Sequence, residues 1–177
     1  MIVLDASAAA FALLDEGETG DRCRTALRAD SRWLVPEQWL VEVLSVIRGN
    51  LLGGKIAADH AADAAAAAAA MDPVVASTRP LAPRIWELRG NLTTHEAAYI
   101  AAAEHYRCAL VTTDARLARA AGIRCDVNLI GVLVGVGPCV RAGGRLGGRP
   151  GGDGDARPDR GVGDDQPGGT VGRRDPP

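Results

Sequence analysis

Short apolar runs alternate along the first 130 residues with longer segments in which apolar residues recur every three or four positions. The runs are rich in β-branched residues and too short for helices, which is typical of strands buried in a parallel sheet. They predict strands at 2–4, 74–76 and 109–113, an extended segment at 34–35 and an edge strand at 123–127.

The longer segments predict helices. Pro36 suits the first position of a helix, the run of alanines that begins at Ala64 has high helix propensity, and Gly122 is of the type expected just beyond a helix end. The expected helices cover about residues 7–15, 21–29, 36–51, 55–71, 81–90, 93–106 and 115–121. Because strands and helices alternate, we expect an α/β domain with a mainly parallel sheet.

The composition changes near residue 130. Residues 131–177 hold 15 of the 22 glycines and 6 of the 10 prolines, and they contain no Glu, Lys, Trp, Tyr or Phe. Such a segment buries too little apolar surface to offset the loss of chain entropy on folding. We therefore expect a folded domain at 1–130 and a disordered tail at 131–177, rich in Gly, Pro, Arg and Asp.

The predicted domain is acidic. Residues 1–130 carry 13 Lys and Arg against 16 Asp and Glu, a net charge of −3. A strongly basic surface for nucleic acid is therefore absent in net terms. Any polyanion would have to be held by local positive charge or by metal ions.

Several other classes of protein are disfavoured. No apolar stretch reaches the roughly 18 residues that a membrane span needs, and the first residues lack the basic region of a signal peptide. The four cysteines have neither CxxC spacing nor a paired histidine nearby, so we expect buried small side chains rather than a zinc site or disulfides. These features predict a cytoplasmic protein without membrane association.

Two aspartates directly follow predicted strands. Asp5 and Asp114 are both expected at the carboxyl edge of the sheet, where the functional groups of parallel sheets gather. Ser7, Thr112 and Thr113 supply nearby hydroxyls that can orient a carboxylate or a metal-bound water molecule. Either aspartate alone also fits a helix cap, a role in which Asp is common.

Two glutamates join this set. Glu42 lies on a polar stripe of a predicted helix, which alone would be a solvated helix face. Glu96 is the third residue after Thr93, which also fits a capping box. Together the four acids suggest a site for Mg²⁺ or Mn²⁺, which prefer carboxylate oxygens. On a phosphodiester, such a site activates water and stabilises the charge that builds on the reacting oxygens.

At these acids the chain resembles a known family. The segments IVLDASA, WLVEVLSVIRG, LTTHEAAYIAAAE and ALVTTDARLARAAG are similar, in order and spacing, to PIN domains and in particular to the VapC toxins of bacterial VapBC toxin–antitoxin pairs. The resemblance covers residues 1 to about 130. It implies a three-layer α/β fold and endonucleolytic cleavage of RNA that depends on Mg²⁺ or Mn²⁺. It also implies a VapB-type antitoxin as a partner and a homodimer.

The resemblance assigns all four acids as catalytic and metal-binding residues. We expect Asp5, Glu42 and Asp114 to hold one ion, and Glu96 to hold a second ion or a bridging water molecule. The family usually has Asp at the position of Glu96, and the additional methylene moves the carboxylate by roughly 1.5 Å. The alternative is therefore a catalytically weakened PIN domain that acts mainly as an antitoxin- or RNA-binding module.

Contacts to the RNA backbone are expected from local arginines such as Arg48, Arg107 or Arg116, which the sequence does not rank. Phosphoryl-transfer and receiver domains also place acids at strand ends, but this class is disfavoured. The residues after Asp5 do not form the Asp-x-Asp pair of haloacid-dehalogenase-like phosphatases, and Lys55 does not follow a predicted strand, as a receiver lysine would.

Apolar residues on the first and third predicted helices admit two interpretations. Phe11, Leu14 and Trp39 belong either to the core or to a surface that contacts an antitoxin helix or a second copy of the chain. The two alternatives differ in how far each side chain is buried.

Overall fold

The computed structural model describes residues 1–131, so the predicted tail lies outside the described residues from position 132 onward. Five strands form one sheet in the order β3-β2-β1-β4-β5, and every neighbouring pair is parallel. The strands are β1 (Ile2–Leu4), β2 (Trp33–Pro36), β3 (Val74–Ala76), β4 (Ala109–Thr112) and β5 (Val127–Leu129). The prediction of an α/β domain with a mainly parallel sheet is confirmed.

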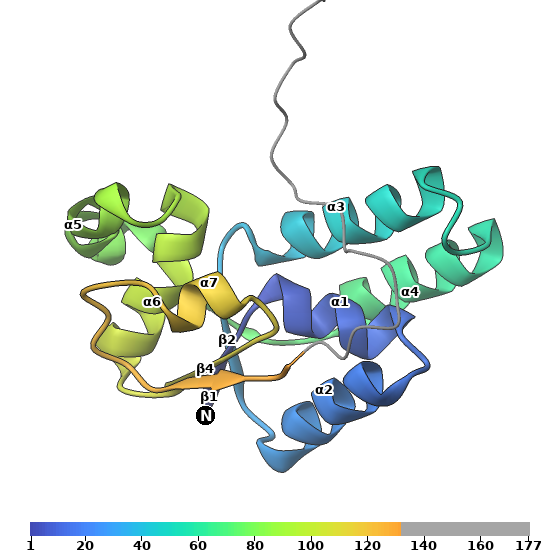
Figure 1. Ribbon diagram of the computed structural model, residues 1–177, viewed down its shortest axis with the longest axis horizontal. Helices are drawn as coiled ribbons and strands as arrows, with labels where there is room; N and C mark the ends of the chain where they lie inside the picture. The colour runs from blue at the N-terminus through green and yellow to red at the C-terminus, as the bar shows by residue number, and fades with distance from the viewer. Residues whose placement is uncertain (132–177) are drawn as a thin grey trace, which may run out of the picture. The chain divides into compact units, whose positions relative to one another are not determined.

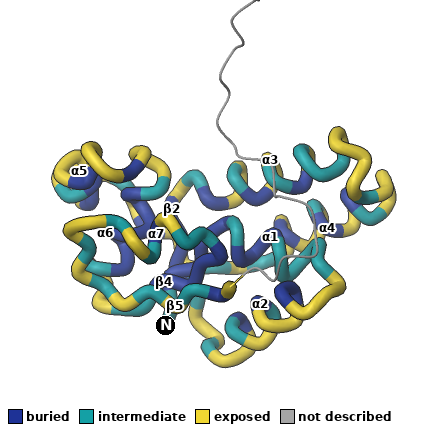
Figure 2. The backbone as a smooth tube through the Cα atoms, viewed as in Figure 1, coloured by how far each residue is buried: buried dark blue, intermediate teal, exposed yellow. Residues whose placement is uncertain are grey.

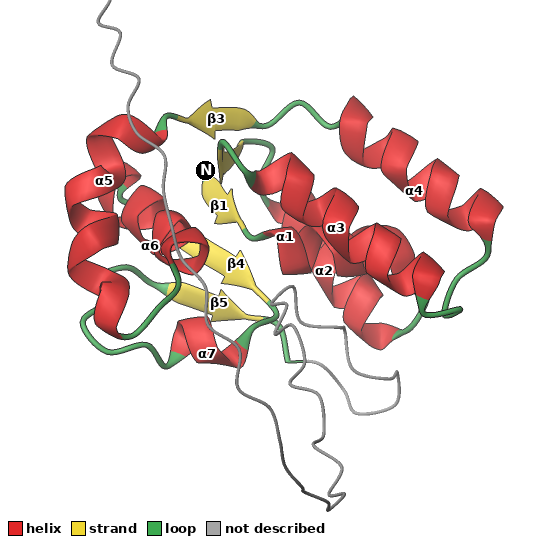
Figure 3. Cartoon of the chain, turned by 90° about the horizontal axis from the view of Figure 1, so that it is seen from above, coloured by secondary structure: helices red, strands yellow, loops and turns green. Residues whose placement is uncertain are grey.

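Helices cover both faces of the sheet (Figures 1 and 3). One layer contains α1 (Ala6–Leu14), α2 (Glu18–Ala29), α3 (Trp39–Leu52) and α4 (Ala58–Ala70). The opposite layer contains α5 (Thr78–Glu87), which continues into a short 3₁₀ turn (Leu88–Gly90), and α6 (Thr94–Tyr106). The short α7 (Ala115–Ala118) packs beside β4 and β5. This arrangement confirms the expected three-layer fold.

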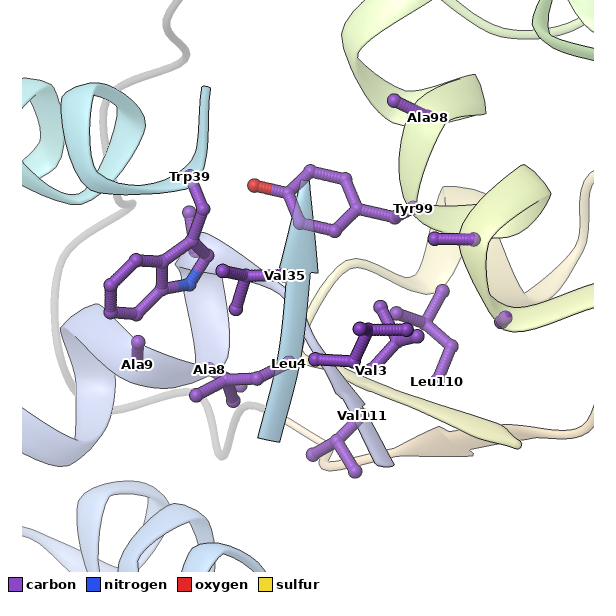
Figure 4. Close-up of a cluster of buried hydrophobic side chains, with 14 of the residues drawn as sticks. Val3, Leu4, Ala8, Ala9, Val35, Trp39, Ala98, Tyr99, Leu110 and Val111 are labelled. Carbon is purple, nitrogen blue, oxygen red and sulfur yellow. The ribbon is translucent and has the colours of Figure 1, made fainter. Parts of the chain in front are cut away.

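The core is made mainly of small aliphatic side chains (Figures 2 and 4). Seven consecutive residues of α6, from Ala97 to Ala103, are buried, and five of them are alanines. Small side chains allow the helix to approach the sheet closely, and α6 contacts β1, β2 and β4. The amino end of α6 is thereby held against the carboxyl edge of the sheet.

Most helix bounds differ from the prediction by up to three residues. Two further differences are set by pairing within the sheet. Pro36 does not begin a helix: it is the last residue of β2 and is paired with Ala76 of β3. The helix begins only at Trp39, after a two-residue connection. The last strand lies at Val127–Leu129 rather than at 123–127, because Leu110 of β4 pairs with Val127. In both places pairing within the sheet decides the boundary, which local sequence patterns do not report.

The structure also separates core from surface on the early helices. Trp39 is 2% exposed and belongs to the core, while Phe11 and Leu14 are partly buried against it. The exposed apolar residues of α3 are instead Leu40, Val41, Leu44 and Leu52, although Leu40 and Leu44 follow the spacing expected of core positions.

Candidate active site

Asp5 lies where the central strand β1 ends, and its carboxylate is buried. Its Oδ2 atom accepts hydrogen bonds from the hydroxyls of Ser7 and Thr112, each at 2.5 Å. The backbone N–H of Thr113 in turn donates to the Ser7 hydroxyl oxygen at 3.1 Å. Asp5 occupies the N-cap position of α1, but its side chain makes no capping hydrogen bond. The carboxylate is therefore held by one hydroxyl from α1 and one from the neighbouring strand β4.

Asp114 follows β4, the strand that pairs with β1. Its backbone N–H donates to the Thr112 hydroxyl oxygen at 2.9 Å, and its Oδ1 accepts from the backbone N–H of Arg116 at 2.7 Å. The second hydrogen bond is the helix cap considered from the sequence. Because Thr112 contacts both aspartates, these two predicted site residues lie together at the carboxyl edge.

Glu42 lies in the first turn of α3, the helix that follows β2. Its Oε2 accepts a hydrogen bond from the Tyr99 hydroxyl at 2.5 Å, across 57 positions of the chain. Tyr99 extends from α6 past the end of β2 toward α3 (Figure 4). The other oxygen, Oε1, is buried and accepts no hydrogen bond, although Nδ1 of the exposed His95 lies 3.3 Å away. A buried carboxylate oxygen without a hydrogen bond is costly unless a cation satisfies it.

Glu96 lies in the first turn of α6 and forms the capping box suggested by the sequence. Its Oε2 accepts from the backbone N–H of Thr93 at 2.9 Å and lies 2.9 Å from the Thr93 hydroxyl. Its Oε1 accepts from Nη2 of Arg116, and Nε of the same arginine lies 3.8 Å from Oδ2 of Asp114. Both oxygens of Glu96 are therefore engaged, and Arg116 connects this glutamate to the site.

Burial and mutual repulsion shape the electrostatics of the site. Burial raises the pKa of Asp5, the hydrogen bonds from Ser7 and Thr112 oppose that shift, and the nearby charge of Asp114 adds to it. Burial also raises the pKa of Glu42, against the hydrogen bond from Tyr99, and the charge of Asp5 raises it further. Three negative groups thus act on one another at this edge, which favours binding of a cation.

The four carboxylates do not converge on one point. Within residues 1–131, no three His, Cys, Asp or Glu side chains are grouped closely enough to hold a metal ion between them. Each carboxylate is instead turned to a partner of its own in the chain. Asp5, Asp114 and Glu42 interact electrostatically, whereas Glu96 is connected to the others through Arg116.

One residue of this site, Tyr99, is not expected from the sequence, and a second, Arg116, is expected only as one of three unranked RNA contacts. Tyr99 orients Glu42, and Arg116 contacts Glu96 and Asp114. The tyrosine falls on the apolar face of its helix and carries no local signal of a polar role. Arg116 is one of the three arginines expected to contact RNA, and in the sequence only its place two residues after Asp114 relates it to the site.

Comparison with known proteins agrees with this architecture. Residues 2–123 match the family described as PIN domain. The chain therefore belongs to the PIN-domain family, as the motifs around the acids predicted.

Relatives within the family carry the VapC name. VapC ribonuclease Mb0985 of Mycobacterium bovis is 35% identical over 133 residues, which cover 73% of this chain and 98% of that protein. Ribonuclease VapC1 of Mycobacterium tuberculosis is 32% identical over 132 residues, which cover 72% of this chain and 96% of that protein. The predicted resemblance to VapC proteins is thus confirmed.

Solved structures support the fold. Mycobacterium tuberculosis VapC20, described as a toxin that cleaves the sarcin–ricin loop, superposes with a TM-score of 0.53 at 16% identity. The match covers 70% of this chain and 97% of VapC20. PAE2754 from Pyrobaculum aerophilum gives a TM-score of 0.52 at 18% identity and covers 71% of this chain and 81% of that protein. Separately, no helix within residues 1–131 is both long and apolar enough to cross a membrane.

Proposed function

We propose that this PIN domain is the toxin of a type II toxin–antitoxin system and hydrolyses phosphodiester bonds in RNA as a divalent-metal-dependent endoribonuclease. One observation carries the proposal: Asp5 and Asp114, at the ends of two paired central strands, are both bound to the Thr112 hydroxyl. The ribonuclease names of relatives at 31–35% identity support the reaction class.

The residues of the site fit Mg²⁺ or Mn²⁺. Asp5, Glu42 and Asp114 offer only hard oxygen donors, which these cations prefer. The buried Oε1 of Glu42 has no hydrogen bond, so a cation would satisfy it. Burial, and to a smaller extent mutual repulsion, raises the pKa values of Asp5 and Glu42, and a cation would offset both effects. We propose that these three residues hold one ion, which requires their side chains to come closer together than they lie in the structure.

The chain's own groups prepare the site for this role. Ser7 and Thr112 hold one oxygen of Asp5, while Tyr99 holds one oxygen of Glu42. These hydrogen bonds orient both carboxylates before a ligand binds, and Glu42 keeps its other oxygen for that ligand. When bound, a divalent cation stabilises negative charge on the phosphodiester oxygens and lowers the pKa of a water molecule.

Loss of the two aspartates is the direct test. Asp5→Asn and Asp114→Asn should each lower Mg²⁺- or Mn²⁺-dependent cleavage of RNA by at least about 100-fold, the scale on which electrostatic groups of active sites act. Asp126→Asn is the matched control, because this exposed aspartate precedes β5 at the opposite edge of the sheet. Undiminished cleavage by both site variants would refute the proposal.

A toxin of this class needs an antitoxin. We infer from the family resemblance that the partner is a VapB-type antitoxin and that the toxin itself is a homodimer. Induced expression should arrest growth, and co-expression of the product of a short upstream reading frame should restore it. Light scattering of the purified toxin should give twice the mass of one chain, 18.3 kDa. Normal growth on induction of both the intact protein and Glu96→Asp would contradict the toxin role.

A further inference from the structure

Arg116 lies on the exposed side of the acid site. Its Nη2 donates to Oε1 of Glu96, and its Nε lies 3.8 Å from Oδ2 of Asp114. Its side chain is 58% exposed, compared with 36% for Asp114 and 19% for Glu96. The guanidinium therefore bridges two acids and also faces solvent, where a substrate would approach.

Glu96 supplies the anchor. One of its oxygens closes the capping box with Thr93, and the other accepts from Arg116. The capping box fixes the carboxylate on the first turn of α6, a helix whose next turns are buried in the core. Glutamate is long enough to make both contacts at once. Arg116, which lies on the four-residue helix α7, is thereby tied to a rigid element.

Arg116 still has donors for a ligand. A guanidinium carries five N–H groups in a fixed planar fork. Within residues 1–131 the contacts of Arg116 are made through Nη2 and Nε, which leaves the two N–H groups of Nη1 to a ligand. Phosphate oxygens match this fork, and charge-assisted hydrogen bonds of this type are about twice as strong as neutral ones.

The other two arginines considered for RNA contacts lie elsewhere. Arg107 follows the end of α6 and precedes β4, at the edge of the sheet opposite the acids. Arg48 lies six positions beyond Glu42 on α3, a rise of about 9 Å along the helix. Arg116 is the one of the three that contacts a site acid.

We propose that Arg116 binds a phosphate group of the RNA at the acid site, and that Glu96 is the positioning residue that holds it there. This inference rests on the proposed function and names the group that receives the polyanion. It gives a role to Glu96, at the position where the resemblance to the family implies Asp. It also explains how a domain with net negative charge brings a phosphate to a cluster of carboxylates.

RNA binding without divalent cations tests the phosphate contact independently of catalysis. The probe is a short fluorescein-labelled single-stranded RNA, followed by anisotropy in EDTA over a range of salt concentrations. Arg116→Gln should weaken binding about tenfold and reduce the slope of log K against log salt by about 0.7, the value for one lost contact to single-stranded RNA. Arg119→Gln, an exposed arginine directly after the same helix, is the matched control and should change both quantities less than twofold.

Steady-state cleavage with saturating Mn²⁺ separates the role of Arg116 in binding phosphate from the role of Glu96 in positioning Arg116. Arg116→Gln should raise the KM for RNA about tenfold, and Arg116→Lys should recover only part of this loss because lysine lacks the fork. Glu96→Gln keeps a residue that closes a capping box, so it should unfold at the wild-type temperature. It should nevertheless raise the KM for RNA several-fold with little change in kcat, because Arg116 is no longer held in position, whereas a fall in kcat alone would show that Glu96 does not act through Arg116.

The outcomes distinguish this inference from the proposed function. Wild-type affinity, salt slope and KM in Arg116→Gln would overturn the inference, even if Asp5→Asn abolishes cleavage. Equal losses in Arg116→Gln and Arg119→Gln would overturn it as well, since they would indicate general charge rather than a site contact. If the wild-type protein cleaves no RNA, the proposed reaction fails, while the anisotropy measurement still decides whether Arg116 binds phosphate.

Discussion

The Thr112 hydroxyl donates to Oδ2 of Asp5 at 2.5 Å, and this bond connects the carboxyl ends of the two central strands. The same oxygen accepts from the backbone N–H of Asp114 at 2.9 Å. One buried side chain thus determines the position of both aspartates. A threonine at the end of a strand is easily read as a β-branched strand residue, but here its hydroxyl organises the site.

Replacing this threonine should impair metal binding more than folding. Thr112→Val keeps the shape of the side chain but removes the hydrogen bond to Asp5. Loss of such an orienting group typically costs about 10- to 100-fold in metal affinity or activity. The Mn²⁺ concentration that gives half-maximal RNA cleavage should rise accordingly, and Thr112→Ser should restore most of the loss. A Thr112→Val variant with the wild-type dependence on Mn²⁺ would contradict this role.

Removing the charge of Asp5 should stabilise the metal-free protein. Burial raises the pKa of Asp5. A carboxyl group with a raised pKa in the folded state favours folding only while it is protonated, and this contribution is lost as the pH rises through the folded-state pKa. At pH 7, above its unfolded-state pKa, the carboxyl group therefore opposes folding, and Asp5→Asn should raise the melting temperature in EDTA by about 4 °C. The gain should shrink on acidification, whereas an equal gain at every pH would indicate another cause.

The ion pair between Arg84 and Glu104 should have the opposite dependence on pH. Arg84 Nε lies 2.6 Å from Oε2 of Glu104 and joins α5 to α6. Burial acts to raise the pKa of Glu104, but the hydrogen bonds from Arg84 and the backbone of Arg124 outweigh it, and the pKa is lowered. Its stabilising contribution is present above the unfolded-state pKa and is lost as the pH falls through the folded-state pKa. Glu104→Gln should lower the free energy of unfolding by about 2 kcal/mol at pH 7.

Denaturant titrations of Glu104→Gln and the wild type at two pH values test this dependence. The difference between the two proteins should be largest at neutral pH and should narrow at acidic pH. Asp59→Asn, which replaces an exposed acid on α4, should leave the stability unchanged and serves as the control. A constant difference across the pH range would show that packing, not charge, is responsible.

Glu96→Asp decides between the proposed toxin and a catalytically weakened PIN domain. Aspartate is the usual residue of the family here, but its shorter side chain cannot make both contacts of Glu96, to Thr93 and to Arg116. We therefore expect the rate of RNA cleavage to fall about tenfold, because Arg116 would no longer be held in position. A large gain in cleavage would instead favour the weakened-site alternative. The measurement is initial rate on RNA at saturating Mn²⁺.

Binding of a divalent cation should stabilise the folded domain. A ligand at 100 times its Kd adds about 2.7 kcal/mol to the free energy of unfolding. Mn²⁺ should therefore raise the melting temperature of the wild type, and EDTA should reverse the shift. The shift should disappear in the double variant Asp5→Asn with Asp114→Asn. If the double variant is stabilised as much as the wild type, the cation binds elsewhere.

Sequence patterns predict the sheet well where the strands are short, apolar and β-branched. The strands at 2–4 and 74–76 have the expected bounds. The prediction at Pro36 is wrong because proline at a helix start is only a local preference, and pairing with Ala76 overrides it. The exposure of Leu40 and Leu44 on α3 likewise depends on which neighbours cover the helix, and spacing alone does not report this.

The acids of the site are predictable because each lies directly after a strand or in the first turn of a helix. Asp5 and Asp114 follow strands, and parallel strands bring their carboxyl ends to one edge. Their orienting hydroxyls, Ser7 and Thr112, are close enough in sequence to be suggested in advance. Tyr99 is not predictable in this way, because its bond to Glu42 joins residues 57 positions apart on different helices.

The strand order has a consequence for how the protein is made. β1 is synthesised first but lies in the centre of the sheet, and its partner β4 begins only at Ala109. The bond between Asp5 and Thr112 spans 107 positions, and contacts of such high sequence separation form late and slowly during folding. A nascent chain that ends before β4 contains Asp5 but neither Asp114 nor Thr112, whose hydroxyl holds Asp5. The acid pair therefore comes into existence only when nearly the whole domain has been synthesised, so a partly synthesised chain lacks it.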